Sequence, residues 1–524
     1  MTKADRTTGE EVKSVIAPMS LRERAAQLFT FSAFAPELDD ATRRLITDLK
    51  VGGIFLGTEC LRRPEQVHRL TSAMQRASLR EGSGIPLFIS ADFVAGAGCK
   101  LLEGATHFPK NRALGAVGDE RLAYEAGKVT AVESLAMGVN FNYSPVVDIN
   151  NNPRNPVIGT HSFGEEPGGV ARLGCAVIKG YQEHGMIATA KHFPGHGDTH
   201  VDSHEDLPVL PFDRERLERF ELYPFREAIA AGVDAVMVGH IAVPLLDPSL
   251  MPASLSYRVT TELLRRQLNF EGLIVTDGLS MKGITNQYSM EEACVRAIIA
   301  GADILLGTAA DYEQAASMLE AVVDAVREGR IPACRIEESL ERILRMKRKY
   351  RLERKATAAA YRPETFRTGA AERLNEELAS KAATPLGGLR KGLLLETQAD
   401  GNGRPRWLLL RDPHTGPFAD ELRAVLPGIE ERTARGWDEM LGLLETVSPE
   451  NGVIVAVSHN KPLEPAWLER LKRRLNGFDR AVWVHFGSEY DVRGAAVPCL
   501  LLYDRAPSLQ RGAARFLSDG KPSQ

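Results

Sequence analysis

The sequence predicts an α/β fold: a (β/α)8 barrel of the TIM type followed by a smaller, doubly wound α/β sandwich domain. Short apolar runs alternate with amphipathic helical stretches from residue 20 to residue 350, and the same alternation returns after residue 385. The chain has 524 residues, of which 44% are hydrophobic and 26% charged, a composition typical of a globular protein with a large core.

Eight apolar runs are the predicted strands of the barrel. They span residues 27–31, 50–57, 86–92, 138–149, 187–191, 234–241, 272–277 and 302–307. Amphipathic stretches such as 214–231 and 256–268 lie between them and are predicted to be helices. The alternation indicates a parallel sheet covered by helices, because parallel strands need long crossover connections. Repetition at this spacing favours a closed barrel, with an open doubly wound sheet as the alternative.

The barrel is predicted to occupy residues 1–350 and to end with a basic helix at 335–350. Residues 351–384 are interpreted as a linker that includes a helix at 371–382. A C-terminal α/β domain is predicted at 385–520. Its strands are expected at 406–411, 452–457, 481–486 and 498–503, with helices between them, as at 419–425 and 464–475. This order predicts a doubly wound sheet.

Charge and hydropathy exclude several classes of protein. The net charge is 65 − 69 = −4, which favours neither a nucleic-acid nor an anionic membrane partner. No run of about 18 uncharged apolar residues predicts a membrane span, and the polar first residues lack the apolar centre of a signal peptide. Six dispersed cysteines without a CxxC pair indicate reduced thiols. We therefore expect a cytoplasmic protein.

Residues 191–204 are the densest cluster of ionisable side chains, with four His, two Asp and one Lys. The histidines recur at every fourth position: His192, His196, His200 and His204. On a continuous helix this spacing would favour a metal site. Pro194, Gly195 and Gly197 interrupt such a helix, so the four rings need not share one face. A metal site and an inert structural loop remain alternatives to a catalytic loop.

The position of this loop favours catalysis, because it follows the carboxyl end of a predicted barrel strand, where barrel active sites are built. Lys191 and His192 lie at the strand end and are suited to donate hydrogen bonds to hydroxyl groups of a ligand. Asp202 and His204 are two residues apart, so a turn can bring a carboxylate beside an imidazole. A carboxylate in that position fixes the ring and stabilises its charged form, which makes His204 a candidate general acid and base.

Asp277 ends the apolar run 272–277 and should lie at the same face of the barrel. A carboxylate at a strand end can simply cap the next turn. The segment that follows, Gly278-Leu279-Ser280-Met281-Lys282-Gly283, makes the pattern more specific.

Five segments together resemble glycoside hydrolase family 3, in particular its β-N-acetylhexosaminidase branch. They are Ser144-Pro-Val-Val-Asp148-Ile-Asn, Asn155-Pro-Val-Ile-Gly159, Lys191-His-Phe-Pro-Gly-His-Gly-Asp198, Asp202-Ser-His204 and Thr276-Asp277-Gly-Leu-Ser-Met-Lys. The resemblance covers nearly the whole predicted barrel, and few other families would combine the fourth segment with the third in this order.

The resemblance implies a retaining double displacement without metal or cofactor. Asp277 would be the nucleophile, and His204, oriented by Asp202, would be the acid and base. Most retaining glycosidases use a second carboxyl group in that role. The resemblance also places Asp92, with Lys191 and His192, on the sugar hydroxyls.

Two departures from the family pattern lie on the sugar-binding side. His161-Ser162-Phe163-Gly164 stands where the branch usually has Arg-Ser-Phe-Gly, and His161 is shorter than Arg and has fewer donors. Asp92-Phe93-Val94-Ala95-Gly96 stands where the family usually has Asp-Gln-Glu-Gly-Gly. We expect retained chemistry with altered subsite preference.

These observations predict an exo-acting β-N-acetylhexosaminidase that releases terminal GlcNAc from oligosaccharides or cell-wall fragments, as in peptidoglycan turnover, and acts as a monomer or homodimer. A phosphorylase is one alternative, because an imidazole repels phosphate less than a carboxylate does. A β-glycosidase of other glycone specificity and a non-catalytic sugar-binding protein are the others. The second domain, with its looser match at Gly487-Ser488-Glu489-Tyr490-Asp491, is expected to serve packing, access or dimerisation.

Overall fold

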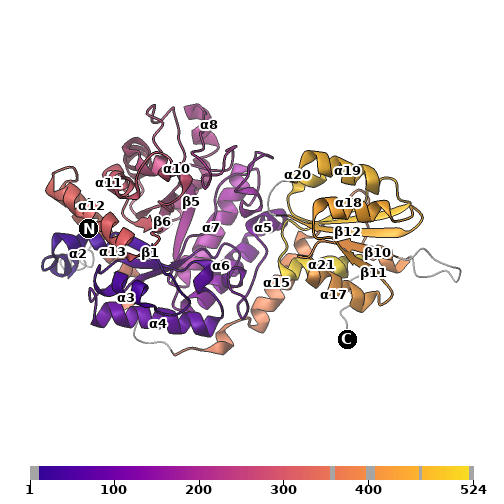
Figure 1. Cartoon of the computed structure of the whole chain (residues 1–524), viewed down its shortest axis with the longest axis horizontal. Coiled ribbons are helices and arrows are strands. Elements are labelled where there is room, and N and C mark those ends of the chain that lie inside the picture. Colours follow the sequence, from indigo (N-terminus) through magenta and orange to yellow (C-terminus); the bar gives the residue numbers. More distant parts are fainter. Residues whose placement is uncertain (1–10, 355–359, 397–406, 460–462, 519–524) are drawn as a thin grey trace.

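The computed structural model describes residues 11–354, 360–396, 407–459 and 463–518. Two sheets, each with its own helices, lie side by side, and helix α15 (Gly369–Ala382) runs between them (Figure 1). The first eight strands form one sheet and the last six form the other. The predicted fold class is confirmed.

The first sheet is a parallel barrel. Its strands are β1 (Phe29–Ser32), β2 (Gly53–Phe55), β3 (Phe88–Ala91), β4 (Phe141–Asn142), β5 (Ile187–Phe193), β6 (Ala235–Val238), β7 (Leu273–Thr276) and β8 (Leu305–Gly307). They pair in the order β7-β6-β5-β4-β3-β2-β1-β8. A parallel bridge between Val275 and Ile304 joins the β7 edge to the segment entering β8 and closes the ring. Each observed strand lies within or overlaps one of the predicted runs.

The barrel helices follow the strands and cover the sheet from outside (Figure 1). They are α2 (Leu21–Ala26), α3 (Asp40–Thr47), α4 (Pro64–Arg80), α5 (Asn111–Val117), α6 (Glu120–Ala136), α7 (Pro167–Glu183), α8 (Arg214–Arg219), α9 (Tyr223–Ala230), α10 (Lys282–Thr285), α11 (Met290–Ala300), α12 (Tyr312–Arg327) and α13 (Ala333–Lys349). Short turns η1 (Thr58–Cys60), η2 (Ala97–Cys99), η3 (Gly159–His161) and η4 (Ala253–Leu255), and the π-type helix η5 (Arg258–Gln267), complete it.

The single helix expected at 214–231 is wrong, because the structure has two helices there. Helix α8 ends at Arg219, and α9 begins at Tyr223 with Pro224 in its first turn. Proline lacks the N–H that a continuing helix needs, whereas the first turn of a new helix does not use that N–H. The stretch 256–268 is helical as predicted but is wound as a π-type helix.

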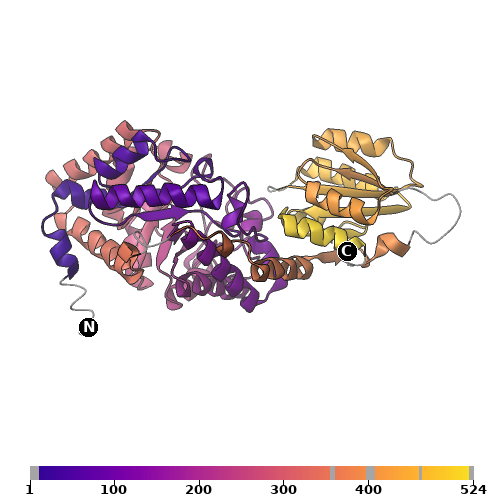
Figure 2. The ribbon, with the colours of Figure 1, turned by 90° about the horizontal axis from the view of Figure 1, so that it is seen from below.

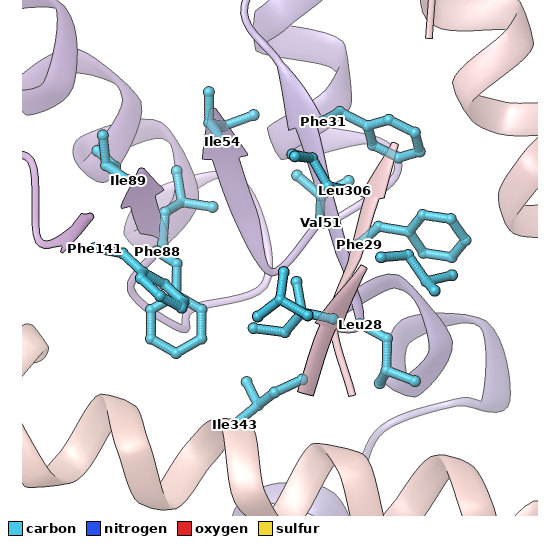
Figure 3. Packing of buried hydrophobic residues seen from close by; sticks show 14 of the residues in the cluster. Leu28, Phe29, Phe31, Val51, Ile54, Phe88, Ile89, Phe141, Leu306 and Ile343 are labelled. Atoms are coloured by element: carbon cyan, nitrogen blue, oxygen red, sulfur yellow. The ribbon is translucent and has the colours of Figure 1, made fainter. Parts of the chain in front are cut away.

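Buried side chains cover both faces of the barrel strands, with Phe29 and Ile54 on one face and Phe88 and Phe141 on the other. Phe29, Ile54, Phe88 and Phe141 are each at most 1% exposed, and Ile343 of α13 packs beneath the strands (Figure 3). Burying such a side chain contributes roughly 1.5–3 kcal/mol relative to leaving it in water. Because both faces of the strands are covered, the strand ends are the place for a site.

The second sheet is mixed. Its strands are β9 (Thr384–Leu386), β10 (Trp407–Arg411), β11 (Glu430–Thr433), β12 (Gly452–Ser458), β13 (Arg480–Phe486) and β14 (Cys499–Leu501), in the order β11-β10-β12-β13-β14-β9. Helices α18 (Trp437–Glu445) and α19 (Pro465–Leu475) lie over one face, and α17 (Gly416–Val425) and α21 (Pro507–Leu517) lie over the other (Figure 1). Figure 2, seen from below, again shows α15 between the barrel and this sheet. The remaining short elements are η6 (Pro363–Thr365), α16 (Leu393–Glu396) and α20 (Glu489–Val492).

Two strands of this sheet were not predicted. Strand β11 reads Glu-Glu-Arg-Thr and is at an edge, with no buried residue among its four. Strand β9 reads Thr-Pro-Leu and is the antiparallel strand at the other edge. Edge strands tolerate charge and proline because one side of the ladder is unpaired, so they lack the apolar run that identifies a central strand.

Loops at the carboxyl ends of β13 and β14 contact the barrel. Arg112 Nε lies 2.7 Å from Glu489 Oε1, and both side chains are largely buried. The Tyr490 hydroxyl donates to the Asn150 carbonyl oxygen at 2.8 Å. The second domain therefore touches the loops that follow barrel strands β3 and β4.

The structure also describes the cysteines and the apolar helices. All six cysteines are unpaired. Within the described ranges, no helix is both long enough and apolar enough to span a bilayer.

Candidate active site

The predicted site residues gather at the carboxyl ends of the barrel strands. Asp92 follows β3, Lys191 and His192 lie in the last part of β5, and Asp277 follows β7. In a closed ring of this order β3 and β7 are four strands apart, so Asp92 and Asp277 stand on opposite sides of the mouth. This is the end at which barrel enzymes build their sites.

Asp277 is held as a carboxylate. Its Oδ1 accepts the Gly278 N–H at 2.8 Å. Burial opposes ionisation, but the His192 and His240 rings, the Gly278 N–H and the Lys191 ammonium together hold the pKa of Asp277 below its usual range. A half-buried carboxylate of this kind can attack an electrophilic carbon.

His240, which was not predicted as a site residue, lies fully buried beside Asp277. Its Nε2–H donates to the Gly278 carbonyl oxygen at 2.9 Å, and Nδ1 pairs with Ser254 Oγ at 2.8 Å. Burial lowers its pKa despite the nearby Asp277 charge, so the ring is neutral and fixes the turn after β7. Its position near the end of the predicted strand 234–241 is the sequence feature that could have identified it as a site residue.

Lys191 and Asp92 form an ion pair across the mouth. Lys191 Nζ lies 2.7 Å from Asp92 Oδ1, with 7% and 33% of the two side chains exposed. Burial opposes ionisation of Asp92, but the Lys191 and Lys100 charges lower its pKa. The structure therefore unites two residues that the sequence separates by 99 positions.

His192 is oriented by Asp148, another residue absent from the predicted site. His192 Nδ1–H donates to Asp148 Oδ2 at 2.7 Å, and the backbone N–H groups of His192 and His196 also donate to this carboxylate. Although burial opposes it, the His192 and His196 contacts keep the pKa of Asp148 low. Because Asp148 takes Nδ1–H, Nε2 of His192 is the ring nitrogen directed elsewhere.

The four loop histidines have separate partners. His196 Nδ1 pairs with Thr199 Oγ1 at 2.7 Å, whereas His200 Nδ1 accepts from Asn152 Nδ2 at 3.1 Å. Among the residues that the structure describes, no three His, Cys, Asp or Glu side chains converge as metal ligands. His196 and His200 shape the loop instead.

The Asp202–His204 pair is formed as predicted. His204 Nδ1 lies 2.7 Å from Asp202 Oδ1, which also accepts the His204 backbone N–H at 3.0 Å. The Asp202 side chain is 10% exposed and that of His204 is 63% exposed. The carboxylate therefore anchors a ring that is largely exposed.

The loop with Asp202 and His204 is tied to the turn that follows Asp277. Gly283 N–H donates to the Ser203 carbonyl oxygen at 3.0 Å. In the described portion of the chain, no hydrogen bond joins His204 directly to Asp277. The contact through Ser203 and Gly283 thus brings the two predicted pieces together without occupying either reactive side chain.

Close backbone approach holds the middle of the loop. A Cβ at Gly197 would lie 1.8 Å from the Ile149 carbonyl oxygen, so only glycine fits there. The Asn155 side-chain amide donates to the carbonyl oxygens of His196 and Gly197 at 2.8 and 3.0 Å. The loop is therefore packed on the segment that follows β4.

His161 lies close enough to Asp92 and Lys191 for their charges to act on its ring. Burial and the Lys110 charge lower its pKa to about 3, so its ring is neutral at ordinary pH. The His161 carbonyl oxygen accepts from Asn111 Nδ2 at 2.8 Å. A neutral ring offers one donor and one acceptor, where an arginine would offer a fixed positive charge and five donors.

The barrel segment matches a known sequence family. Residues 20–346, more than half of the chain, match the sequence profile described as the glycosyl hydrolase family 3 N terminal domain. The chain belongs to glycosyl hydrolase family 3. The family match contains all of the strand-end residues described above.

Individual family 3 relatives extend the comparison. Beta-hexosaminidase A of Pseudoalteromonas piscicida is 35% identical over 369 residues, 67% of this chain and 61% of that protein, so the match spans about three fifths of the relative. The beta-hexosaminidase of Thiobacillus denitrificans is 37% identical over 52% of this chain and 75% of its own. A solved family 3 beta-N-acetylglucosaminidase from Paenibacillus sp. str. FPU-7 is 34% identical, with a TM-score of 0.86 over 96% of this chain and 97% of that one.

Proposed function

We propose that this family 3 protein is a retaining exo-glycosidase that hydrolyses terminal non-reducing β-linked GlcNAc residues from oligosaccharides or cell-wall fragments. One observation carries the proposal. The ionised Asp277 carboxylate directly follows β7, and the Ser203–Gly283 contact joins the turn after it to the loop that holds the His204 imidazole beside Asp202. Relatives named beta-hexosaminidase and a structural neighbour named beta-N-acetylglucosaminidase support the choice of glycone.

In the first step Asp277 attacks the anomeric carbon, and the bond from that carbon to the leaving oxygen breaks. His204 gives its Nε2 proton to the leaving oxygen, while the Asp202 carboxylate stabilises the ring through Nδ1–H. The low pKa of Asp277 keeps the nucleophile ionised at the pH where a histidine can still carry a proton.

In the second step His204 removes a proton from water, and the resulting oxygen attacks the anomeric carbon of the glycosyl-enzyme. The Asp277 carboxylate leaves, and His204 regains its proton. Two inversions at the same carbon retain the β configuration.

The glycone is held by groups away from the scissile bond. Lys191 and the Asp92 carboxylate bind hydroxyls on the β3 side, and His192 presents Nε2 to the ring. His161 adds a neutral donor or acceptor. Hydrogen bonds to hydroxyls in a buried site discriminate strongly against sugars that lack them.

Aryl β-glycosides of GlcNAc, GalNAc, glucose and glucuronic acid, assayed with and without phosphate, test the proposal. We expect fastest turnover of the GlcNAc member, independent of phosphate, with β-GlcNAc as the first product. Absence of GlcNAc turnover would overturn the glycone assignment. A phosphate-dependent sugar 1-phosphate product would identify a phosphorylase instead, and binding without turnover of any member would identify a sugar-binding protein.

A further inference from the structure

Lys110 connects the barrel site to the second domain. It precedes α5, and its backbone N–H donates to Asp504 Oδ2 at 3.2 Å. Lys110 Nζ lies 4.0 Å from Asp504 Oδ1, and the two side chains are 15% and 3% exposed. A barrel cation is thus held by a buried carboxylate that follows β14, 394 positions later in the chain.

The same lysine adjoins His161, one of the residues proposed to bind the glycone. Asn111, the next residue, binds the His161 carbonyl oxygen through its side chain. After burial, the Lys110 charge is the largest cause of the low pKa of His161, and Asp92 acts on that ring as well. The Asn111 hydrogen bond places Lys110 next to the His161 segment, and the charge of Lys110 acts on the His161 ring.

The strand order of the barrel indicates which part of a sugar Lys110, His161 and Asp92 would contact. Asp277, the proposed nucleophile at C1, lies at the end of β7, and Asp92 lies at the end of β3, opposite it in the ring. A pyranose that reaches from one side to the other turns its hydroxyls remote from C1 towards β3. Lys191 already shares its charge with Asp92, and His161 is neutral, so Lys110 and Lys100 are the further cations on this side. Lys110 is paired with Asp504 of the second domain.

Contacts around Lys110 restrict its position. Arg112, two residues later, pairs with Glu489 and lies 4.9 Å from the centroid of the Tyr503 ring. Tyr503 adopts a left-handed backbone conformation, with φ of 59°, directly before Asp504. A donor that is already ordered loses little freedom when a ligand binds.

We propose that Lys110 is a further glycone-binding residue, which donates to hydroxyls remote from C1, and that Asp504 of the second domain is its positioning residue. The inference rests on the proposed function of the same site. It gives the second domain a role in sugar recognition without a catalytic group.

The test uses the full chain with Lys110→Met, Lys110→Arg and Asp504→Asn, assayed on an aryl β-GlcNAc and on its 4-deoxy and 6-deoxy analogues. Lys110→Met should lower kcat/KM by roughly 10–100-fold, mainly through KM, as expected for a lost hydrogen bond to a charged group. Lys110→Arg should restore most of it. Loss of the contacted hydroxyl should impair the wild type but cause little further loss in Lys110→Met.

Asp504→Asn should raise KM in the same direction, and the double variant should be no worse than Lys110→Met alone. Arg493→Gln is the matched control, because it removes a different ion pair between the domains, Arg493–Glu165, and should leave KM unchanged.

Three results would overturn the inference. Wild-type turnover with Lys110→Met unchanged on all substrates would refute the Lys110 role and leave the proposed function standing. Equal losses on all substrates without rescue by arginine would show a structural role only. No wild-type turnover of any GlcNAc substrate would refute the proposed function and the inference together.

Discussion

Asp202→Asn tests the proton-transfer role of the dyad most selectively. The substitution keeps the size of a side chain that is 10% exposed and removes the charge that lies 2.7 Å from His204 Nδ1. A hydrogen bond to a charged group contributes about 1.5–3 kcal/mol, which corresponds to roughly 10–100-fold in rate when that charge develops in the transition state.

The assay compares kcat/KM for aryl β-GlcNAc substrates whose phenols become progressively less acidic. A good leaving group departs without proton donation, so we expect a loss below about threefold for the 2,4-dinitrophenyl glycoside. The full loss of roughly 10–100-fold should appear with the unsubstituted phenyl glycoside. The plot of rate against phenol pKa should therefore be steeper for the variant.

Asp198→Asn is the control, because Asp198 lies in the same loop and pairs with Arg216 and Asn151 rather than with a histidine. It should leave the leaving-group dependence unchanged. A loss in Asp202→Asn that is equal for all leaving groups, or one that Asp198→Asn reproduces, would refute proton transfer through the dyad.

Two further predictions concern the scaffold. Gly197→Ala should lower kcat/KM by at least about tenfold, because the added Cβ would push the loop away from Ile149. Gly416→Ala is the control and should keep its activity, because open space surrounds that position. Equal activity of both variants would contradict the packing argument. Burial lowers the pKa of Lys347 from 10.5 to about 7. Between pH 7 and 10.5 the folded state therefore binds fewer protons than the unfolded state. The free energy of unfolding should therefore rise by about 2 kcal/mol from pH 7.5 to 9. In denaturant unfolding, Lys347→Met should lack this dependence on pH. The same pH dependence in both proteins would contradict the prediction.

The barrel was predictable because its strands are buried on both faces and therefore read as apolar runs, as at 187–191 and 272–277. Strand β11, which is charged, and strand β9, which contains a proline, were not predicted, because edge strands are not selected for burial. Pro224 could have indicated the end of one helix and the start of another, but the amphipathic pattern continues across 214–231 and suggested a single helix.

The positions of Asp277, Lys191 and His192 at strand ends were predictable, because each follows or ends an apolar run. Asp148 and His240 were missed because they act on backbone groups and on other site residues, a role that leaves no spacing pattern. The Lys110–Asp504 contact joins segments from the two domains, so only the folded arrangement shows it.

The most direct measurement of the central claim is covalent trapping with an activated 2-deoxy-2-fluoro β-glycoside, followed by peptide mass spectrometry. Fluorine at C2 disfavours the cationic transition states of both steps, and the activated leaving group lets the first step proceed, so the glycosyl-enzyme accumulates. We predict one added sugar per chain, located on the peptide that contains Asp277 and absent from Asp277→Asn. An adduct on another carboxylate, or turnover of β-GlcNAc substrates with inversion at the anomeric carbon, would contradict the account.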